Sequence, residues 1–206
     1  MNIARFGAAA LAAAVFVAAA GSARAVVPAS HTLMPAMAQP AFSLTDNNAA
    51  DMQYCRSTGG IVEHRIPEYG TNNPNPLVLA GSADFCQYTS KDKSSRIHVL
   101  LTTLNATLPS LAAMAYYAHP KLIEGPCTSG GANPASCYCT QLGGSDQFGG
   151  ANLAGGAWVG RGIDADLEAC IFPDMSSIDS WGLAYRSNGT IRGTDLSKVL
   201  KYKKPK

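Results

Sequence analysis

The chain has 206 residues and a formal net charge of +2, which is enough chain for one ordinary domain or two small ones. Arg5 and Arg24 account for that excess, because without them the basic and acidic residues are equal in number. The remaining basic side chains gather near the end of the chain, so the body is mildly acidic. This distribution argues against a nucleic-acid-binding domain, which would carry a basic face.

Residues 1–25 have the three parts of an export signal. Arg5 gives a positive start, Ala8–Ala20 is an apolar run of small residues, and Ala23–Ala25 is a small-x-small cleavage site. The apolar run is short for a membrane-spanning helix, and no cysteine follows it to accept a lipid. We therefore expect cleavage after Ala25 and a periplasmic or secreted protein with no integral membrane segment.

Two segments at the ends of the mature chain show no sustained pattern. Residues 26–47 contain three prolines among small and polar residues, which is typical of a flexible leader. Residues 195–206 hold five lysines. We interpret them as a solvated basic tail rather than a tether to anionic lipid or polymer.

The first half of the mature chain, residues 48–119, is expected to alternate short helices with strands. Its first helix should end at the glycine pair 59–60. Strands are expected in three segments: 61–66, 77–79 and 85–88. Residues 97–104 could form a buried strand or the start of a helix, because the hydrophobic periodicity of a short apolar run does not distinguish between the two. Residues 108–119 favour a helix that the next proline ends.

A glycine-rich linker, residues 120–132, leads to the second half, residues 133–194. Asn133 and the proline after it are typical of a helix start, and Gly143 is typical of a helix stop, so a short helix is expected between them. An apolar, partly aromatic strand is expected later in this half, ending at a Pro-Asp turn pair.

The two halves share a skeleton. Residues 54–60 (YCRSTGG) and 138–144 (YCTQLGG) both contain Tyr-Cys followed by Gly-Gly, and the next cysteine follows after 31 residues in each half. An aromatic residue stands two positions after each of these later cysteines. We therefore predict an α+β protein of two small disulfide-stapled helix–β-hairpin–helix repeats, the first of them degenerate, with residues 108–119 as a packing spacer.

The second half also resembles a known family. The motif is spread over short segments: Asn133–Ser136, Tyr138-Cys139, Gly143-Gly144, Cys170–Asp174, Trp181 and Tyr185-Arg186. These segments resemble the bacterial exported "putative hemolysin" family, domain of unknown function 333, which often occurs in tandem. The family label implies membrane lysis and says little else about activity. Two cysteines of that family, near Ile178 and after Arg186, are absent here and Cys137 is an extra one, so its crosslinks do not carry over.

Six cysteines in an exported chain are typical of a disulfide framework. If the halves fold as equivalent units, the expected pairs are Cys55–Cys86, Cys139–Cys170 and Cys127–Cys137. An exchange of ends between two neighbouring cysteines would instead give Cys127–Cys139 and Cys137–Cys170. A zinc site is the functional alternative, but the spacing is not that of a zinc knuckle, so we expect no metal and no cofactor.

Motifs of common enzymes are missing from the sequence. It contains no Gly-x-Ser-x-Gly elbow and no His-Glu-x-x-His helix. His64, His98 and His119 are isolated from other candidate catalytic residues in the sequence, which is typical of polar structural residues. The alternating acidic residues of 164–168 lack the spacing of a calcium loop. We therefore expect no enzymatic activity.

Three functions are compatible with this sequence. The main expectation is an exported non-enzymatic binding or envelope-associated protein, whose partner is an envelope or extracellular component and not a nucleic acid. A peptidase inhibitor is one alternative, with the loop between Cys127 and Cys137 as its only supporting feature. The membrane-active protein of the family label is the other, although no apolar run long enough to span a bilayer follows residue 25.

The partner surface is expected in the second half, because it keeps aromatic and arginine residues that the first half lacks. The tentative binding residues are Trp158, Arg186, Trp181 and Tyr185. Such residues supply a large contact area at a small entropy cost. Trp181 and Tyr185 are also natural core residues of a small domain, which makes Trp158 and Arg186 the sharper candidates.

Overall fold

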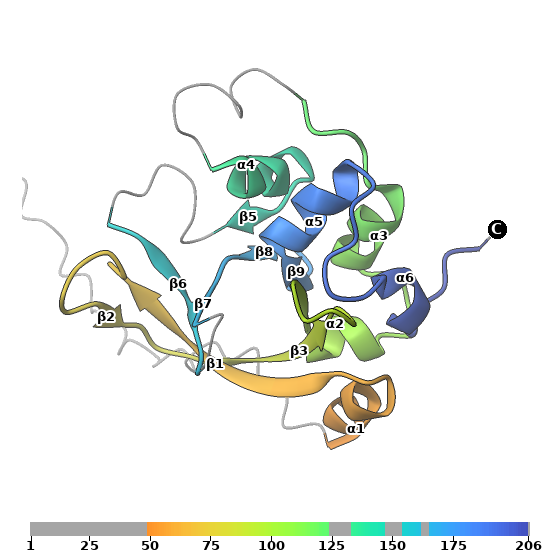
Figure 1. Ribbon diagram of the computed structural model, residues 1–206, viewed down its shortest axis with the longest axis horizontal. Coiled ribbons are helices and arrows are strands. Elements are labelled where there is room, and N and C mark those ends of the chain that lie inside the picture. Colours follow the sequence, from red (N-terminus) through yellow and green to blue (C-terminus); the bar gives the residue numbers. More distant parts are fainter. Residues whose placement is uncertain (1–48, 124–132, 147–153, 162–164, 206) are drawn as a thin grey trace, which may run out of the picture. The chain divides into compact units, whose positions relative to one another are not determined.

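The computed structural model describes residues 49–123, 133–146, 154–161 and 165–205, drawn in colour in Figure 1. All of them belong to one compact unit, Gln39–Lys206. The predicted signal peptide and leader lie outside the described residues. So do most of the predicted linker and parts of the glycine-rich segment before Ala165.

The described residues form helices and strands that mix along the chain. The helices are α1 (Ala49–Ser57), α2 (Leu101–Asn105), α3 (Leu111–Ala118), α4 (Pro134–Gln141), α5 (Ser180–Ser187) and α6 (Leu196–Val199). The strands are β1 (Ile61–Tyr69), β2 (Leu77–Val78), β3 (Ala83–Thr89), β4 (Arg96–Leu100), β5 (Ser145–Asp146), β6 (Gly156–Val159), β7 (Asp166–Leu167), β8 (Ala169–Ile171) and β9 (Ser177–Asp179). The predicted α+β class is confirmed.

The strands of the described residues join in a single antiparallel half-barrel sheet. Its order is β5-β8-β9-β4-β3-β1-β6-β7, with β2 also paired to β1. The first half of the chain meets the second where Val99 of β4 pairs with Ile178 of β9, and again where β6 pairs with the end of β1. The structure therefore shows one shared sheet and no clear repeats, instead of two separate units packed through α3. Sharing the sheet satisfies backbone groups that two small separate sheets would leave at their edges.

The two faces of the sheet bury different groups. One face, here called the helix face, carries the cysteines of β3 and β8 and is covered by the helices; its core includes Val99, Ile178 and Leu183. The opposite face, here called the Trp158 face, has a smaller apolar cluster: Ala83, Phe85, Leu100, Trp158, Leu167, Ala169 and Ile171. The division follows the alternation of side chains along each strand.

Side-chain caps fix where the helices begin. At α4, Asn133 Oδ1 accepts hydrogen bonds from Ala135 N (2.9 Å) and Ser136 N (3.4 Å), as the sequence predicts. At α5, Asp179 Oδ1 accepts from Gly182 N at 3.1 Å. Each such cap is worth about 1 kcal/mol.

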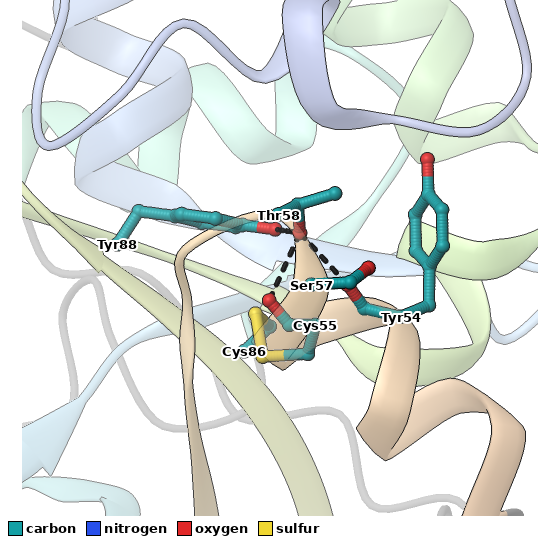
Figure 2. The surroundings of a disulfide bond; sticks show 6 residues. All are labelled: Tyr54, Cys55, Ser57, Thr58, Cys86 and Tyr88. Atoms are coloured by element: carbon teal, nitrogen blue, oxygen red, sulfur yellow. Dashed lines mark hydrogen bonds between the residues drawn. A yellow bond between two sulfur atoms is a disulfide. The ribbon is translucent and has the colours of Figure 1, made fainter.

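Two of the predicted disulfides are confirmed. Cys55 of α1 bonds to Cys86 of β3, and Cys139 of α4 bonds to Cys170 of β8. Figure 2 shows the first of them beside Thr58, whose hydroxyl is 2.6 Å from that of Tyr88. Each closes a loop that stabilises the fold by about 3–4 kcal/mol in the chain-entropy model.

The third predicted disulfide is only partly within the described residues. Cys137 is disulfide-bonded, and no described cysteine is free. Its predicted partner, Cys127, lies outside the described residues, so the pairing itself stays a prediction.

The shared sequence skeleton has a local structural cause. Gly59 and Gly143 end their helices with φ of +87° and +84°, a conformation that favours glycine. Each is followed by a glycine that lies against a disulfide, since a Cβ on Gly60 or Gly144 would stand within 2.9 Å of both sulfur atoms. The strand register after the glycine is also alike, with Ile61 opposite Gln87 and Ser145 opposite Ile171.

The end of the chain is packed more closely than the predicted solvated tail. Leu196 and Leu200 are fully buried in the helix-face core. Tyr54 donates a hydrogen bond from its hydroxyl to Val199 O at 3.0 Å, and Tyr117 donates one to Tyr202 O at 2.9 Å. The lysine-rich composition of this segment did not indicate the short helix α6, and Lys203 also donates from its Nζ atom to the carbonyl oxygens of Ser197 and Lys198.

We predict that Gly60→Ala and Gly144→Ala destabilise the protein more than Gly59→Ala. The new Cβ would stand 2.2 Å and 2.5 Å from a sulfur atom, whereas a Cβ on Gly59 meets nothing within 4 Å and costs only about 1 kcal/mol of backbone strain. Urea unfolding under oxidising conditions measures the three free energies. Equal losses for all three variants would contradict the close packing of the glycines on the disulfides.

Candidate functional site

A network of buried ionisable side chains crosses the Trp158 face. Its members, Glu63, Arg65, His98 and Asp179, come from β1, β4 and β9 and are here called the buried network. Strand alternation places them on one face, because Glu63 pairs with Phe85 and the β4–β9 register sets residue 98 beside residue 179. Only Glu63 retains appreciable exposure, with 19% of its side chain accessible.

Arg65 is the most buried member, with no exposed surface. Its Nε and Nη2 atoms donate to Glu63 Oε2 at 3.0 and 2.5 Å. Its Nη1 atom donates to the carbonyl oxygens of Trp158 and Ala165 at 3.0 and 3.1 Å. The guanidinium therefore connects β1 to β6 and to the residue before β7, which compensates its burial.

His98 lies between two carboxylates. Its Nε2 atom is 3.3 Å from Glu63 Oε2, and its Nδ1 atom is 3.6 Å from Asp179 Oδ2. Asp179 uses its other oxygen to cap α5. His98 thus connects the buried network to the start of that helix.

The surroundings shift the pKa values of the network in opposite directions. Burial by itself lowers the pKa of His98, but the carboxylates of Asp179 and Glu63 outweigh it, so the pKa is raised above its ordinary value. Burial by itself raises the pKa of Glu63, but His98 and Arg65 outweigh it, so that pKa is lowered. Both shifts favour the charged forms of these two groups, although Arg65, whose Nη2 atom lies 3.2 Å from His98 Nε2, opposes the charge on His98.

A pocket of about 600 Å³ opens beside the network. It is lined by Val62–His64, Ile66 and Glu68 of β1 and by residues 159–161 at the end of β6. Glu63 belongs both to the pocket and to the buried network. His64 lies on the other side of β1, where its Nδ1 atom is 2.7 Å from Asp84 Oδ1 and most of its side chain is exposed.

The charged groups of the buried network are engaged with one another. The described residues that line the pocket include two glutamates, one histidine and one arginine. Among the residues that the structure describes, no group of three or more His, Cys, Asp and Glu could hold a metal ion. The described residues also contain no helix that is long and apolar enough to cross a membrane.

The structure separates the four predicted binding residues. Trp158 is 6% exposed and its ring packs 6.2 Å from that of Phe85 on the Trp158 face. Arg186 lies 5.2 Å over the ring of Tyr116 and is 3.9 Å from Asp195. Both of the stronger candidates, Trp158 and Arg186, are therefore engaged in contacts within the fold.

The other two predicted residues lie together on α5. Trp181 and Tyr185 are one helical turn apart, with their rings 6.1 Å from each other, and Arg192 lies 5.2 Å over the Tyr185 ring. Tyr185 is 42% exposed. We call Trp181, Tyr185 and Arg192 the α5 face.

Sequence reasoning missed the buried network. His98 is isolated in the sequence because Glu63 and Asp179 are far from it along the chain, and only the strand pairing brings them together. The one local signal was the charged run Glu63-His64-Arg65 inside an expected strand, since a strand with alternating sides must bury part of such a run.

Comparisons with protein-family models, curated proteins and solved structures gave no match. The resemblance to the exported family therefore stays a prediction from the sequence motif, and the function has to be inferred from the geometry of this chain.

We predict that the free energy of unfolding passes through a maximum as the pH changes, and that the buried network sets the pH of this maximum. The contribution of His98 is present in full below about pH 6.5, the ordinary imidazole pKa, and is lost as the pH rises through the raised pKa of the folded state. The contribution of Glu63 is lost as the pH falls through its lowered pKa. Urea unfolding as a function of pH measures both limbs, and an imidazole NMR titration measures the His98 pKa directly.

His98→Gln should remove the alkaline limb, whereas His64→Gln, at an exposed position, should keep it. An imidazole of His98 that titrates below its ordinary value would contradict the network.

We predict that Trp158→Ala destabilises the fold by about 3–5 kcal/mol, because it empties a core position on the Trp158 face. Tyr185→Ala should change stability by about 0.5 kcal/mol, as is usual for an exposed residue. Thermal and urea unfolding of both variants test this contrast. A Trp158→Ala protein as stable as the wild type would restore Trp158 as a contact residue.

Proposed function

We propose that this protein is an exported, non-enzymatic binding protein whose partner surface is the α5 face. The observation that carries the proposal is the exposed ring of Tyr185, which lies between the half-buried ring of Trp181 and the guanidinium of Arg192. Aromatic and arginine side chains are the usual anchors of binding surfaces.

The α5 face is held in place before any partner arrives. Arg192 Nε donates to Arg96 O at 3.2 Å, which fixes the guanidinium over Tyr185. The adjacent Gly193 has a φ of +58° and packs against the backbone of β3 and β4, so the loop that carries Arg192 lies directly on the sheet. Because little side-chain entropy remains to be lost, such a surface binds at a reduced cost.

The chemistry of the face indicates the class of partner. An exposed aromatic ring such as that of Tyr185 favours flat apolar surfaces such as sugar rings, and a guanidinium favours carboxylate or phosphate groups. An envelope polymer that carries both kinds of group fits this combination. The two disulfides agree with such a location, since they are typical of proteins outside the cytoplasm.

The absence of catalysis is part of the same proposal. The groups of the buried network interact with one another and fix β1, β4, β6 and α5. The loop that would make a peptidase inhibitor lies outside the described residues for most of its length, so no geometry supports that alternative.

We predict that the mature protein co-sediments with purified peptidoglycan sacculi or with lipopolysaccharide vesicles, and that Tyr185→Ala reduces the bound fraction at least about fivefold, a loss of about 1 kcal/mol. Tyr69→Ala is the matched control, because Tyr69 is 46% exposed but belongs to β1, away from the α5 face. Equal losses for the two variants, or no binding to either polymer, would contradict the proposal.

The same preparation also tests the alternatives. Release of haemoglobin from erythrocytes would favour the membrane-active protein of the family label. Stoichiometric loss of activity in a panel of proteases would favour an inhibitor.

A further inference from the structure

Helix α3 is apolar on every side and yet lies at the surface. Its sequence, Leu111–Ala118, contains no charged residue, and its only polar side-chain groups are two tyrosine hydroxyls. One side packs into the helix-face core through Tyr116 and two alanines. On the opposite side Leu111 and Met114 are 47% and 36% exposed. A helix that is apolar all round is normally covered all round, so the open side of α3 is a candidate contact surface.

The open side of α3 is a continuous apolar surface. Leu111, Met114 and Ala118, here called the α3 face, are three and four residues apart, a spacing that places them on one side of a helix. Leu108 and Ile123, on the segments that enter and leave the helix, are also largely exposed. Exposed apolar residues are therefore concentrated in this stretch of the chain.

The C-terminal end of α3 meets the basic end of the chain. The hydroxyl of Tyr117 donates to Tyr202 O at 2.9 Å, and the two rings lie edge to face with their centroids 6.2 Å apart. Figure 1 shows α3 beside α6 and the segment that follows α6. The two tyrosines are 85 positions apart in the sequence, so only the fold brings the apolar helix and the lysine-rich segment together.

The charge beside the α3 face is of one sign. Residues 106–123 and 196–205 contain no aspartate or glutamate. Lys201 and Lys203 donate from their Nζ atoms to neutral oxygen atoms, those of the Asn105 side chain and of the backbone, so these contacts leave their charges in place. The same two segments hold five lysines: Lys121, Lys198, Lys201, Lys203 and Lys204.

Two carboxylates approach the ends of these segments, and both are engaged by other groups. Asp174 Oδ2 accepts a hydrogen bond from Leu111 N at 2.7 Å, at the start of α3. Asp195 Oδ1 accepts one from Ser197 N at 3.1 Å and lies 3.9 Å from the Arg186 guanidinium. The lysines therefore give this part of the surface a positive charge, which attracts an anionic partner.

We propose that the α3 face binds the surface of an anionic phospholipid bilayer without crossing it. Leu111 and Met114 would enter the boundary between the headgroups and the acyl chains. Tyr117 and Tyr202 would lie at the level of the headgroups, where tyrosine is enriched in membrane proteins. The neighbouring lysines would contact the anionic headgroups.

The combination of two signals favours a bilayer as the partner. A small apolar insertion gives weak, reversible membrane binding, and basic side chains beside it add attraction to anionic lipid. The fold supplies both signals at one place, with the apolar side chains on α3 and the lysines at its C-terminal end. The site does not depend on the α5 face, because Arg186 of α5 packs on Tyr116, on the buried side of α3.

Co-sedimentation of the mature protein with phospholipid vesicles tests the proposal. We expect binding to vesicles of phosphatidylglycerol and phosphatidylethanolamine, and at least about tenfold weaker binding to vesicles of phosphatidylcholine, which offer no net negative charge. Equal binding to the two, or no binding to either, would overturn the proposal. The vesicles contain neither peptidoglycan nor lipopolysaccharide, and Tyr185→Ala should bind them like the wild type, so the result is independent of the function proposed for the α5 face.

A pair of double variants tests the place of contact. Leu111→Gln with Met114→Gln should weaken binding to the anionic vesicles at least about tenfold, because it removes the apolar insertion and keeps good helix formers at exposed positions. Leu77→Gln with Val78→Gln is the matched control, since these residues of β2 are 62% and 60% exposed. Equal losses for the two double variants would show that the α3 face is not the contact.

Two measurements on the wild-type protein complete the test. With spin-labelled lipid in the vesicles, the methyl NMR signals of Leu111 and Met114 should broaden, whereas those of Leu77 and Val78 should keep their intensity. Broadening of the β2 signals alone would overturn the proposal. Sedimentation velocity without lipid examines a second copy of the chain as the alternative partner, and a dimer that the α3 double variant dissociates would also overturn it.

Discussion

The full burial of the Arg65 guanidinium is the constraint on which much of the structure depends. An uncompensated charge in a protein interior costs several kcal/mol, so its partners must be in place whenever the chain is folded. Glu63 and the carbonyl oxygens of Trp158 and Ala165 fulfil this requirement. They belong to parts of the chain that are about a hundred residues apart, which explains why the two halves form one sheet rather than two.

The same constraint extends to the helices. His98 lies between the carboxylates of Glu63 and Asp179, and Asp179 is also the N-cap of α5. On the opposite face of the sheet, the two disulfides tie α1 and α4 to β3 and β8. Charge compensation therefore stabilises one face of the sheet, and covalent crosslinks stabilise the other.

The ionisable groups of the interior act on stability. Burial opposes the charged forms of Glu63 and His98, but their partners outweigh it, so the pKa of Glu63 is lowered and that of His98 is raised. Their charged forms therefore favour the folded state, whereas the proposed partner surface uses aromatic rings and a guanidinium.

The sequence by itself determined the local elements and two crosslinks. Tyr-Cys followed by Gly-Gly predicted the disulfides Cys55–Cys86 and Cys139–Cys170, and Asn133 predicted the start of α4, because caps, glycine turns and cysteine intervals act over short stretches. Only the tertiary structure decided the shared sheet, the network around His98 and the burial of Trp158. Those features depend on strand pairing between distant segments, and the pattern along one strand does not reveal which strand will lie beside it.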